Sequence, residues 1–202
     1  MAYRNTQAAR RMLSDLASTQ GGYFTAKQAA GVGYGKRHLD YHVKAGNLGR
    51  VGRGLFRLPA IPLSEHDDLI RVSLWSRGRD DCPQVVVSHV TALAVHGLGE
   101  LLPIRMHLTA PRVFRKKPPP GCVLHRANLA DDEVEEREGF RVTVPLRTLL
   151  DVAEQETVTQ EQLNQVVKQA LAEGIVRRTK LTETVRRLAP DSRLSRAISA
   201  VV

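Results

Sequence analysis

Aromatic residues, cysteines and long apolar runs are all scarce in this chain of 202 residues. Phe, Tyr and Trp make up 4% of it, too few for the aromatic platforms on which many proteins stack single-stranded nucleic acid. No apolar run approaches the roughly 18 residues that a membrane span needs. The opening residues, MAYRNTQAARRML, lack the apolar core of a secretory signal. We therefore expect a cytoplasmic protein with no membrane partner.

Cys82 and Cys122 are the only cysteines, which excludes a disulfide framework and fits a reducing compartment. The run CVLH, from Cys122 to His125, is half of a zinc-binding pattern. No second Cys/His pair of suitable spacing follows it. The sequence therefore predicts no metal site and no cofactor.

Acidic residues are almost absent from the first third of the chain. Residues 1–62 contain ten Lys or Arg against Asp15 and Asp40, a net charge of 10 − 2 = +8. Residues 63–202 contain the other twenty basic residues against nineteen acidic ones, a net charge of 20 − 19 = +1. This asymmetry predicts a basic module that meets a polyanion and a near-neutral module with another role.

Helix and turn signals in the basic segment follow the order of a winged helix-turn-helix. Apolar residues recur at helical spacing from Thr6 to Ser18, Thr25 is placed to cap the short helix AKQAAG, and a third helix is predicted from Gly35 to Ala45. The runs LGRV and LFRL flank GRG as the two strands of a hairpin. Pro59 and Pro62 make LPAIPL a short, stiff linker.

The remaining residues alternate between strand and helix patterns. An amphipathic helix is predicted from Ser64 to about Trp75, followed by strands at QVVVSH, RMHLTAP, CVLHRA and RVTV, helices at VTALAVHGLG and LRTLLDVAEQ, and an acidic loop at DDEVEEREGF. Residues 156–202 have helical patterns. We predict an α+β protein with a winged helix-turn-helix domain at 1–62 and a larger mixed α/β domain at 63–202 that ends in helices.

The outer face of the third helix is the predicted DNA-binding surface. At 100° per residue, Leu39 and Val43 share the inner face, and basic and polar residues lie outside. Arg37 suits a bidentate contact to guanine, whereas Lys36 and Lys44 suit phosphates. The predicted DNA-binding residues are Thr25, Lys27, Lys36, Arg37, His38, Tyr41, Lys44, Arg50 and Arg53, the last two on the hairpin.

The sequence also allows other interpretations of the charged residues. A charge run is often only a solvated face, and RNA is disfavoured by the few aromatic residues without being excluded. The loop RKKPPPG is interpreted as an exposed connection, although Arg115, Lys116 and Lys117 are candidates for further DNA contacts.

The sequence contains no constellation typical of an enzyme. The four histidines at 89, 96, 107 and 125 are interpreted as packed, hydrogen-bonded residues, because no carboxylate or cysteine companion has a catalytic spacing. VVVSHV lacks the glycines of a nucleophile elbow. The acids at 131–138 fall in a predicted loop, without the strand and lysine of a metal-dependent nuclease. We predict that the chain is not an enzyme.

The ordered set of motifs resembles one family. GGYFTAKQAAGVGYGKRHLDYHVKAGNLGRVGRGLFRLP is similar to the N-terminal winged-helix domain of the AbiEi antitoxins of type IV toxin–antitoxin and abortive-infection systems. VVVSHVTALAVHGLG, MHLTAP, VLHRANL and FRVTVPLRTLLDVAE resemble the central region of that family in the same order. The resemblance covers about residues 20–155, and a short segment with helical patterns follows TLLDVA where some related proteins have a nuclease-like domain.

The resemblance implies a bacterial repressor that binds double-stranded operator repeats in its own promoter. It also implies that the protein counteracts a nucleotidyltransferase-like toxin through its C-terminal domain, without forming a stable complex. The alternatives are a winged-helix regulator whose second domain senses a ligand or a partner, and a metal-dependent nuclease.

Overall fold

A computed structural model describes residues 2–201, with the side chains of residues 7–201. Met1 and Val202, at the outer ends of the two predicted domains, lie outside the described residues. The protein is α+β, as predicted, and it divides into two compact units. The first unit comprises the residues up to Gln84 together with Glu136–Phe140, and the second comprises Val85–Glu135 together with the residues from Arg141 onward.

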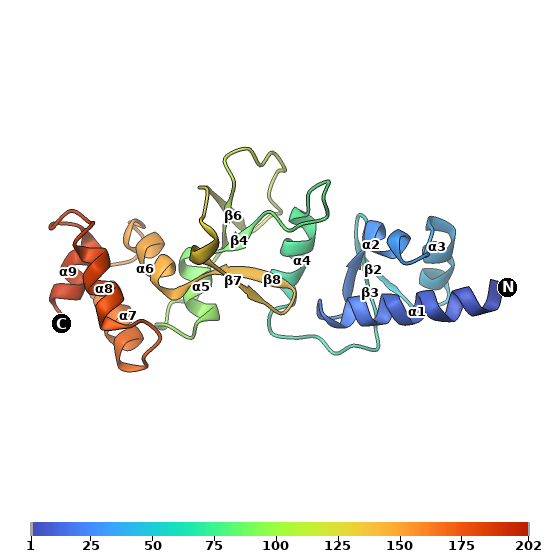
Figure 1. The fold of residues 1–202 in the computed structure, drawn as a ribbon, viewed down its shortest axis with the longest axis horizontal. Coiled ribbons are helices and arrows are strands. Elements are labelled where there is room, and N and C mark those ends of the chain that lie inside the picture. The colour runs from blue at the N-terminus through green and yellow to red at the C-terminus, as the bar shows by residue number, and fades with distance from the viewer. Residues whose placement is uncertain (1, 202) are drawn as a thin grey trace. The chain divides into compact units, whose positions relative to one another are not determined.

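The first unit has the element order of a winged helix-turn-helix (Figure 1). The predicted hairpin is confirmed, but the sequence did not predict a further strand that pairs antiparallel with the other side of β3 and completes a three-stranded sheet. The helices are α1 (Ala2–Ser18), α2 (Ala26–Gly31), α3 (Lys36–Lys44) and α4 (Asp67–Ser76), and the strands are β1 (Tyr23–Thr25), β2 (Gly49–Gly52) and β3 (Leu55–Arg57).

Local signals set the ends of these helices. The Thr25 hydroxyl accepts the N–H of Gln28, and the Gln28 side chain accepts the N–H of Thr25, so α2 begins with a reciprocal capping box. Gly46 follows α3 with φ +74, a left-handed conformation that glycine adopts without strain. One core unites the helices and the sheet, and its large members are Leu13, Phe24, Tyr34, Leu39, Leu48 and Phe56.

Helix α4 belongs to the first unit, whereas the sequence places the domain boundary before it, after residue 62. The Tyr23 hydroxyl donates to Asp67 Oδ2 at 2.7 Å, and Arg77, just after α4, donates to Gln20 Oε1 at 2.8 Å. These polar contacts tie α4 to β1 and to the end of α1. A long-range contact of this kind leaves no trace in local composition, so a proline-rich linker looked like a boundary.

The second unit is built on a five-stranded sheet with the strand order β6-β5-β4-β8-β7, of which the end of β7, the turn and the first residue of β8 (residues 136–140) are grouped with the first unit. Strand β5 runs antiparallel to β4 and parallel to β6, and β4 runs parallel to β8. Helices α5 (His89–Val95) and α6 (Pro145–Ala153) pack against each other, and α5 also packs against β5. The strands are β4 (Val86–Val87), β5 (Met106–Ala110), β6 (Cys122–Arg126), β7 (Val134–Arg137) and β8 (Phe140–Thr143).

The prediction of a loop for the acidic segment DDEVEEREGF is partly wrong. It forms a short 3-10 helix, η1 (Asp131–Glu133), followed by β7, which is an edge strand of the sheet. Gly139, with φ +83, makes the turn into β8. Charged side chains on an edge strand discourage further strand pairing, and this explains why the segment has the composition of a loop.

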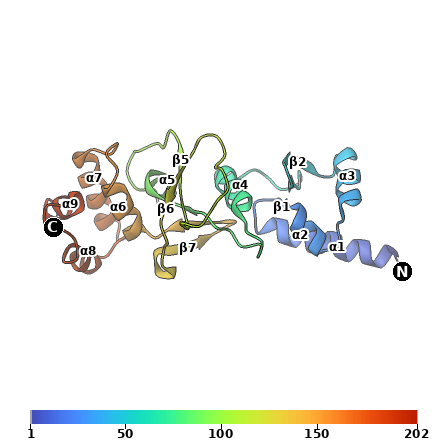
Figure 2. The ribbon, with the colours of Figure 1, turned by 90° about the horizontal axis from the view of Figure 1, so that it is seen from above.

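The second unit ends in three helices, as the sequence predicts (Figure 2). They are α7 (Gln160–Ala172), α8 (Arg178–Val185) and α9 (Arg193–Ser199). Buried leucines and valines from α5, α6 and these three helices form one core, with Leu149, Val152, Leu163, Val166, Leu181 and Leu194 among its members.

Candidate nucleic-acid interface and a histidine cluster

Helix α3 is held by its inner face. Leu39 is 3% exposed in the core of the first unit, and Val43 packs against the same cluster from one turn further along. These are the two residues that the helical projection places inside. Their burial fixes which face of α3 remains for solvent.

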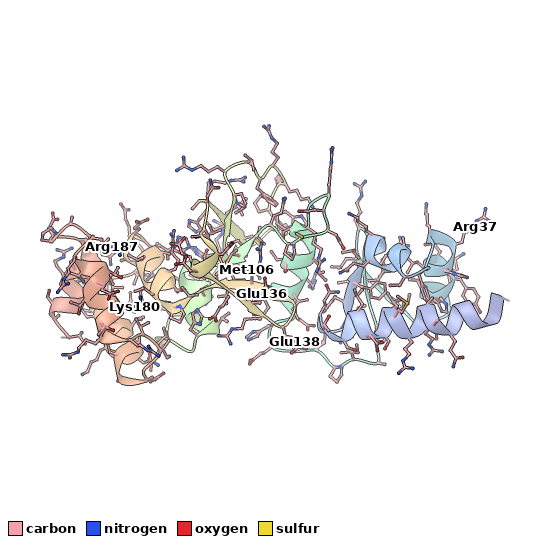
Figure 3. The ribbon with its side chains drawn as sticks, viewed as in Figure 1. Arg37, Met106, Glu136, Glu138, Lys180 and Arg187 are labelled. Atoms are coloured by element: carbon pink, nitrogen blue, oxygen red, sulfur yellow. The ribbon has the colours of Figure 1, made fainter. Side chains whose placement is uncertain are left out.

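The outer face of α3 is cationic and exposed. Tyr41 is 65% exposed, and Arg37 projects away from the helix (Figure 3). The imidazole rings of His38 and His42 lie near the Tyr34 ring, with centroids 5.8 and 5.6 Å from its centroid. The exposed residues of α3 that the sequence predicts as DNA contacts are Lys36, Arg37, His38, Tyr41 and Lys44.

The wing carries the two arginines of the prediction, but they differ in their surroundings. Arg50 on β2 donates to Asp40 of α3 at 2.7 Å, and its guanidinium lies 5.4 Å from the centroid of the Phe56 ring. Arg53 is exposed at the hairpin tip. Arg50 is therefore engaged by the one acidic residue of α3, whereas Arg53 faces solvent.

The predicted phosphate contacts at the start of α2 are also engaged within the first unit. The hydroxyl of Thr25 caps α2, as described above. The ammonium of Lys27 donates to the carbonyl oxygen of Arg79 at 2.5 Å. Both side chains remain close to the surface, but a phosphate would have to share them with these partners.

Three histidines meet in the second unit, from α5, β5 and β6. The rings of His89 and His125 stack with centroids 3.6 Å apart, and His107 Nδ1 lies 3.0 Å from His125 Nε2. The side-chain amide of Gln155 lies 3.0 Å from His107 Nδ1. The cluster is partly open, because His107 and His125 are only half-buried.

The hydrogen bonds around the cluster are compatible with neutral imidazoles. Thr109 donates its hydroxyl to Ser88 Oγ at 2.8 Å, which leaves the Ser88 hydrogen for His89 Nδ1, also at 2.8 Å. Gln155 then donates to His107 Nδ1, which makes that nitrogen an acceptor toward His125. With all three imidazoles neutral, His107 Nδ1 is shared between the Gln155 amide and His125 Nε2.

Burial reinforces this neutral state. Desolvation, together with the neighbouring His125 and His107, lowers the pKa of His89 to about 3. Desolvation also lowers the pKa of His107 and of His125. Burial removes much of the hydration that an imidazolium needs, and a second imidazolium beside it would repel it.

A buried carboxylate lies beside the cluster. Asp151 Oδ1 accepts from Arg147 Nε at 2.8 Å, but Oδ2 has no hydrogen-bond partner and lies 4.0 Å from His89 Nδ1. Burial raises the pKa of Asp151 to about 6 despite the Arg147 guanidinium. His89 itself adopts φ +57, which is rare for a residue with a side chain. The site thus combines a strained backbone with an incompletely paired carboxylate.

The sequence predicts packed, hydrogen-bonded histidines at these positions but not that three of them lie in contact. The signal was the pairing of two predicted strands: parallel register places His107 opposite Val123 and Thr109 opposite His125, on the sheet face that α5 covers. Strand order is not readable from a single sequence, so the cluster was out of reach.

Two further properties bear on the class of protein. Within residues 2–201, no group of three or more His, Cys, Asp or Glu is arranged to hold a metal ion. Over the same residues, every helix is too short or too polar to cross a bilayer.

The chain thus combines a unit of the winged helix-turn-helix type, which presents an exposed basic helix, with a second, mixed α/β unit. Residues 11–59 match the family described as a transcriptional regulator, AbiEi antitoxin, and residues 85–199 match the AbiEi antitoxin C-terminal domain. The chain belongs to the AbiEi antitoxin family, as the resemblance in its motifs indicates.

A solved structure has a similar fold. The RV2827C protein from Mycobacterium tuberculosis matches with a TM-score of 0.61 and 15% sequence identity, over 96% of this chain and 77% of that one. At this identity the likeness concerns the fold alone. A search of curated proteins finds no match to the chain.

Proposed function

We propose that the protein is a DNA-binding antitoxin that represses its own operon and counteracts a nucleotidyltransferase-like toxin encoded beside it. The observation that carries the DNA-binding part is the exposed cationic face of α3, in a segment whose net charge is +8. A helix of this kind reads base edges in the major groove, while flanking cations neutralise phosphates.

Within this proposal the predicted residues have different roles. Arg37 reads a base, most naturally guanine through its planar fork, and Lys36 and Lys44 hold phosphates. Arg53 extends from the wing toward the backbone or the minor groove. Thr25, Lys27 and Arg50 contribute less to affinity, because each already has a partner within the first unit.

The DNA-binding part is tested with the promoter of the gene itself. Labelled duplexes that contain the upstream repeats are titrated with the full chain, against duplexes of the same length and shuffled sequence. We expect tighter binding to the repeats at every salt concentration, with a steep loss of affinity as salt rises. Equal affinity for both duplexes would refute repression by operator recognition.

The antitoxin part is tested by the neighbouring gene and by rescue. We expect an adjacent gene for a nucleotidyltransferase-like protein that slows growth when expressed alone, and growth restored by co-expression of this chain. Co-purification is expected to be weak, since this kind of antitoxin acts without a stable complex.

A second candidate function is a winged-helix regulator whose second unit senses a ligand. The half-buried histidine cluster favours it, because Asp151 Oδ2 and Gln155 Oε1 have no hydrogen-bond partner there. The two functions are separated by gene neighbourhood: a regulator of this type needs no toxin gene beside it, and its co-expression would rescue no toxicity.

A further inference from the structure

An open pocket of about 640 Å³ lies in the second unit, between the end of α7 and the start of α8. Its lining combines two kinds of side chain. Lys168, Arg177 and Arg178 supply cations, and apolar residues that include Leu171, Val176 and Val201 supply most of the other side chains of its walls. A pocket of this composition suits a ligand that is both anionic and partly apolar.

The charged residues of the pocket lining are all basic, and Glu173, between the lining residues Ala172 and Gly174, accepts a hydrogen bond from Gln169 at 2.8 Å. Residues 177–187 contain five Lys or Arg against Glu183 alone, a net charge of 5 − 1 = +4, and Glu183 is paired with Lys180 at 3.5 Å. Lys180 and Arg187 mark this basic segment in Figure 3.

The pocket cations are free to bind a partner. Lys168, Arg177 and Arg178 are exposed, and within residues 7–201 no hydrogen bond or ion pair holds their side chains. These three cations therefore face solvent without an internal counter-charge. Such a surface attracts an acidic partner and loses that attraction when salt screens it.

The apolar walls decide between two kinds of acidic partner. A nucleic-acid backbone offers phosphates but no apolar group to fill the space beside Leu171 and Val201. An acidic peptide segment with an aliphatic side chain offers both, because the aliphatic group enters the pocket while flanking carboxylates meet the cations. The observed combination favours the peptide.

We propose that this pocket is a docking site for a short acidic segment of a partner protein, with one aliphatic side chain as its anchor. The inference that the partner is the toxin rests on the proposed function. Three exposed cations and a small apolar contact give a weak, salt-sensitive interaction. A contact of this strength engages the partner without a lasting complex.

The first experiment measures binding of a labelled peptide to the full chain by fluorescence anisotropy. The probe is Glu-Asp-Leu-Asp-Glu-Leu, and its control has Ser in place of both Leu. We expect the probe to bind at least fivefold more tightly than the control. Equal binding, or none at 1 mM protein, would overturn the proposal.

A matched pair of variants locates the site. Arg177→Glu/Arg178→Glu reverses two charges at the pocket and suits the start of α8, where acidic residues favour the helix dipole. Arg186→Glu/Arg187→Glu reverses two charges just beyond the other end of α8, outside the pocket. We expect a loss of tenfold or more for the first and less than threefold for the second. Equal losses would assign binding to diffuse charge and refute the pocket.

Binding of a random DNA duplex tests the alternative that the basic segment binds nucleic acid and not a peptide. If Arg177→Glu/Arg178→Glu weakens duplex binding tenfold while the peptide does not bind, the basic segment is a nucleic-acid surface and the proposal is wrong. If the wild-type chain binds the peptide but rescues no toxicity, the proposed function fails and the docking site stands. If the wild type rescues and Arg177→Glu/Arg178→Glu does so equally well, the toxin is not the partner at this site.

Discussion

Asp40 is an unusual residue for the surface on which it lies. It is one of two acids in the first 62 residues, and it stands on α3, where it pairs with Arg50 of the wing. Both side chains are about half exposed, so the pair adds little to folding stability. The main effect of Asp40 is electrostatic. Its carboxylate makes the potential of this surface less positive, and it holds the guanidinium of Arg50, which would otherwise be available to DNA.

Replacing Asp40 is therefore expected to strengthen DNA binding. Asp40→Asn removes one negative charge, which raises the net charge of the surface by one, and frees Arg50 for a phosphate. One further phosphate contact raises affinity by roughly three- to tenfold near 0.1 M salt. Titration of random and operator duplexes by anisotropy measures both affinities, and we expect the ratio between them to fall because the gain is independent of sequence.

Asp15→Asn is the matched control. It makes the same change in charge on the exposed side of α1 and breaks no ion pair that involves the wing. We expect an increase of less than twofold. If the two variants gain equally, net charge alone governs binding and the Asp40–Arg50 pair has no specific role.

Arg37 and Lys44 are expected to separate specificity from affinity. Arg37→Ala removes a bidentate donor, so it should reduce operator binding by about 1–3 kcal/mol and leave random duplexes much less affected. Lys44→Ala should weaken both kinds of duplex by a similar factor and lower the salt slope by about 1. Salt titrations of the two variants on both duplexes measure this. An unchanged operator preference in Arg37→Ala would contradict its role as a reader of bases.

At the scale of one element, the wing depends on a single glycine for its turn. Gly54 has φ +69, and its carbonyl accepts the N–H of Ala26, which joins the wing to the start of α2. Gly54→Ala has open space for its methyl group but forces alanine into a left-handed conformation, which costs about 1 kcal/mol or slightly more. For a unit of this size that lowers the midpoint of thermal unfolding by roughly 4–8 °C.

Gly52→Ala provides the comparison. Gly52 lies two residues away, outside the left-handed region, and an added Cβ would also meet nothing within 4 Å. We expect no loss of stability, because the unfolded chain loses some freedom and the folded chain is unstrained. Thermal unfolding of the full chain, monitored with a probe in the first unit, distinguishes Gly54→Ala from Gly52→Ala. A similar loss in both would mean that the wing needs flexibility rather than one left-handed residue.

At the scale of the whole molecule, acid is expected to unfold the second unit before the first. The folded pKa of His89 is about 3 and its unfolded value is near 6.5, so acidification below pH 6.5 protonates the unfolded chain first and destabilises the fold. The pKa of His107 and of His125 is displaced in the same direction. Asp151 opposes them, because its folded pKa of about 6 lies above its unfolded value and its protonation stabilises the fold between about pH 6 and pH 4.

The three histidines outweigh the one carboxylate. We expect the unfolding free energy of the second unit to fall by on the order of 1 kcal/mol between pH 7.5 and pH 5, as measured by urea unfolding with a probe in that unit. Asp151→Asn removes the opposing contribution, so its stability should fall more steeply over the same range. A stability that is constant or rises toward pH 5 in the wild type would rule out buried neutral histidines.

Much of the first unit was predictable, because its signals are local. The inner position of Leu39 and Val43, the helix stop at Gly46 and the hairpin around GRG each depend on neighbours within a few residues. Strand β1 was not predictable, since three residues become a strand only when β3 lies beside them. The histidine cluster was missed for the same reason: it depends on the parallel pairing of β5 with β6.

The exposure of the predicted DNA-contact residues on α3 follows from the sequence, but the hydrogen-bond partners of the other predicted residues do not. Arg37, Lys36 and Lys44 are exposed as the helical projection implies. The engagement of Arg50 by Asp40 and of Lys27 by the Arg79 carbonyl involves residues 10 and 52 positions apart. Contacts between residues so far apart in the sequence depend on the fold. The sequence alone therefore predicts the same availability for all these cations, whereas the structure shows that Arg50 and Lys27 already have partners.

Residues 136–140 belong to the first unit, although the chain that surrounds them belongs to the second. The Phe140 ring lies 5.4 Å from that of His66, and Gly139 approaches Ile70 so closely that an added Cβ would be 3.1 Å from its side chain. The polypeptide therefore crosses between the units three times, at 84, 135 and 140. A gene fragment that stops at codon 84 would encode a first unit with one of its packing surfaces uncovered. Recombination cannot exchange this whole unit as a single contiguous cassette, so the unit and its companion are constrained to be inherited together.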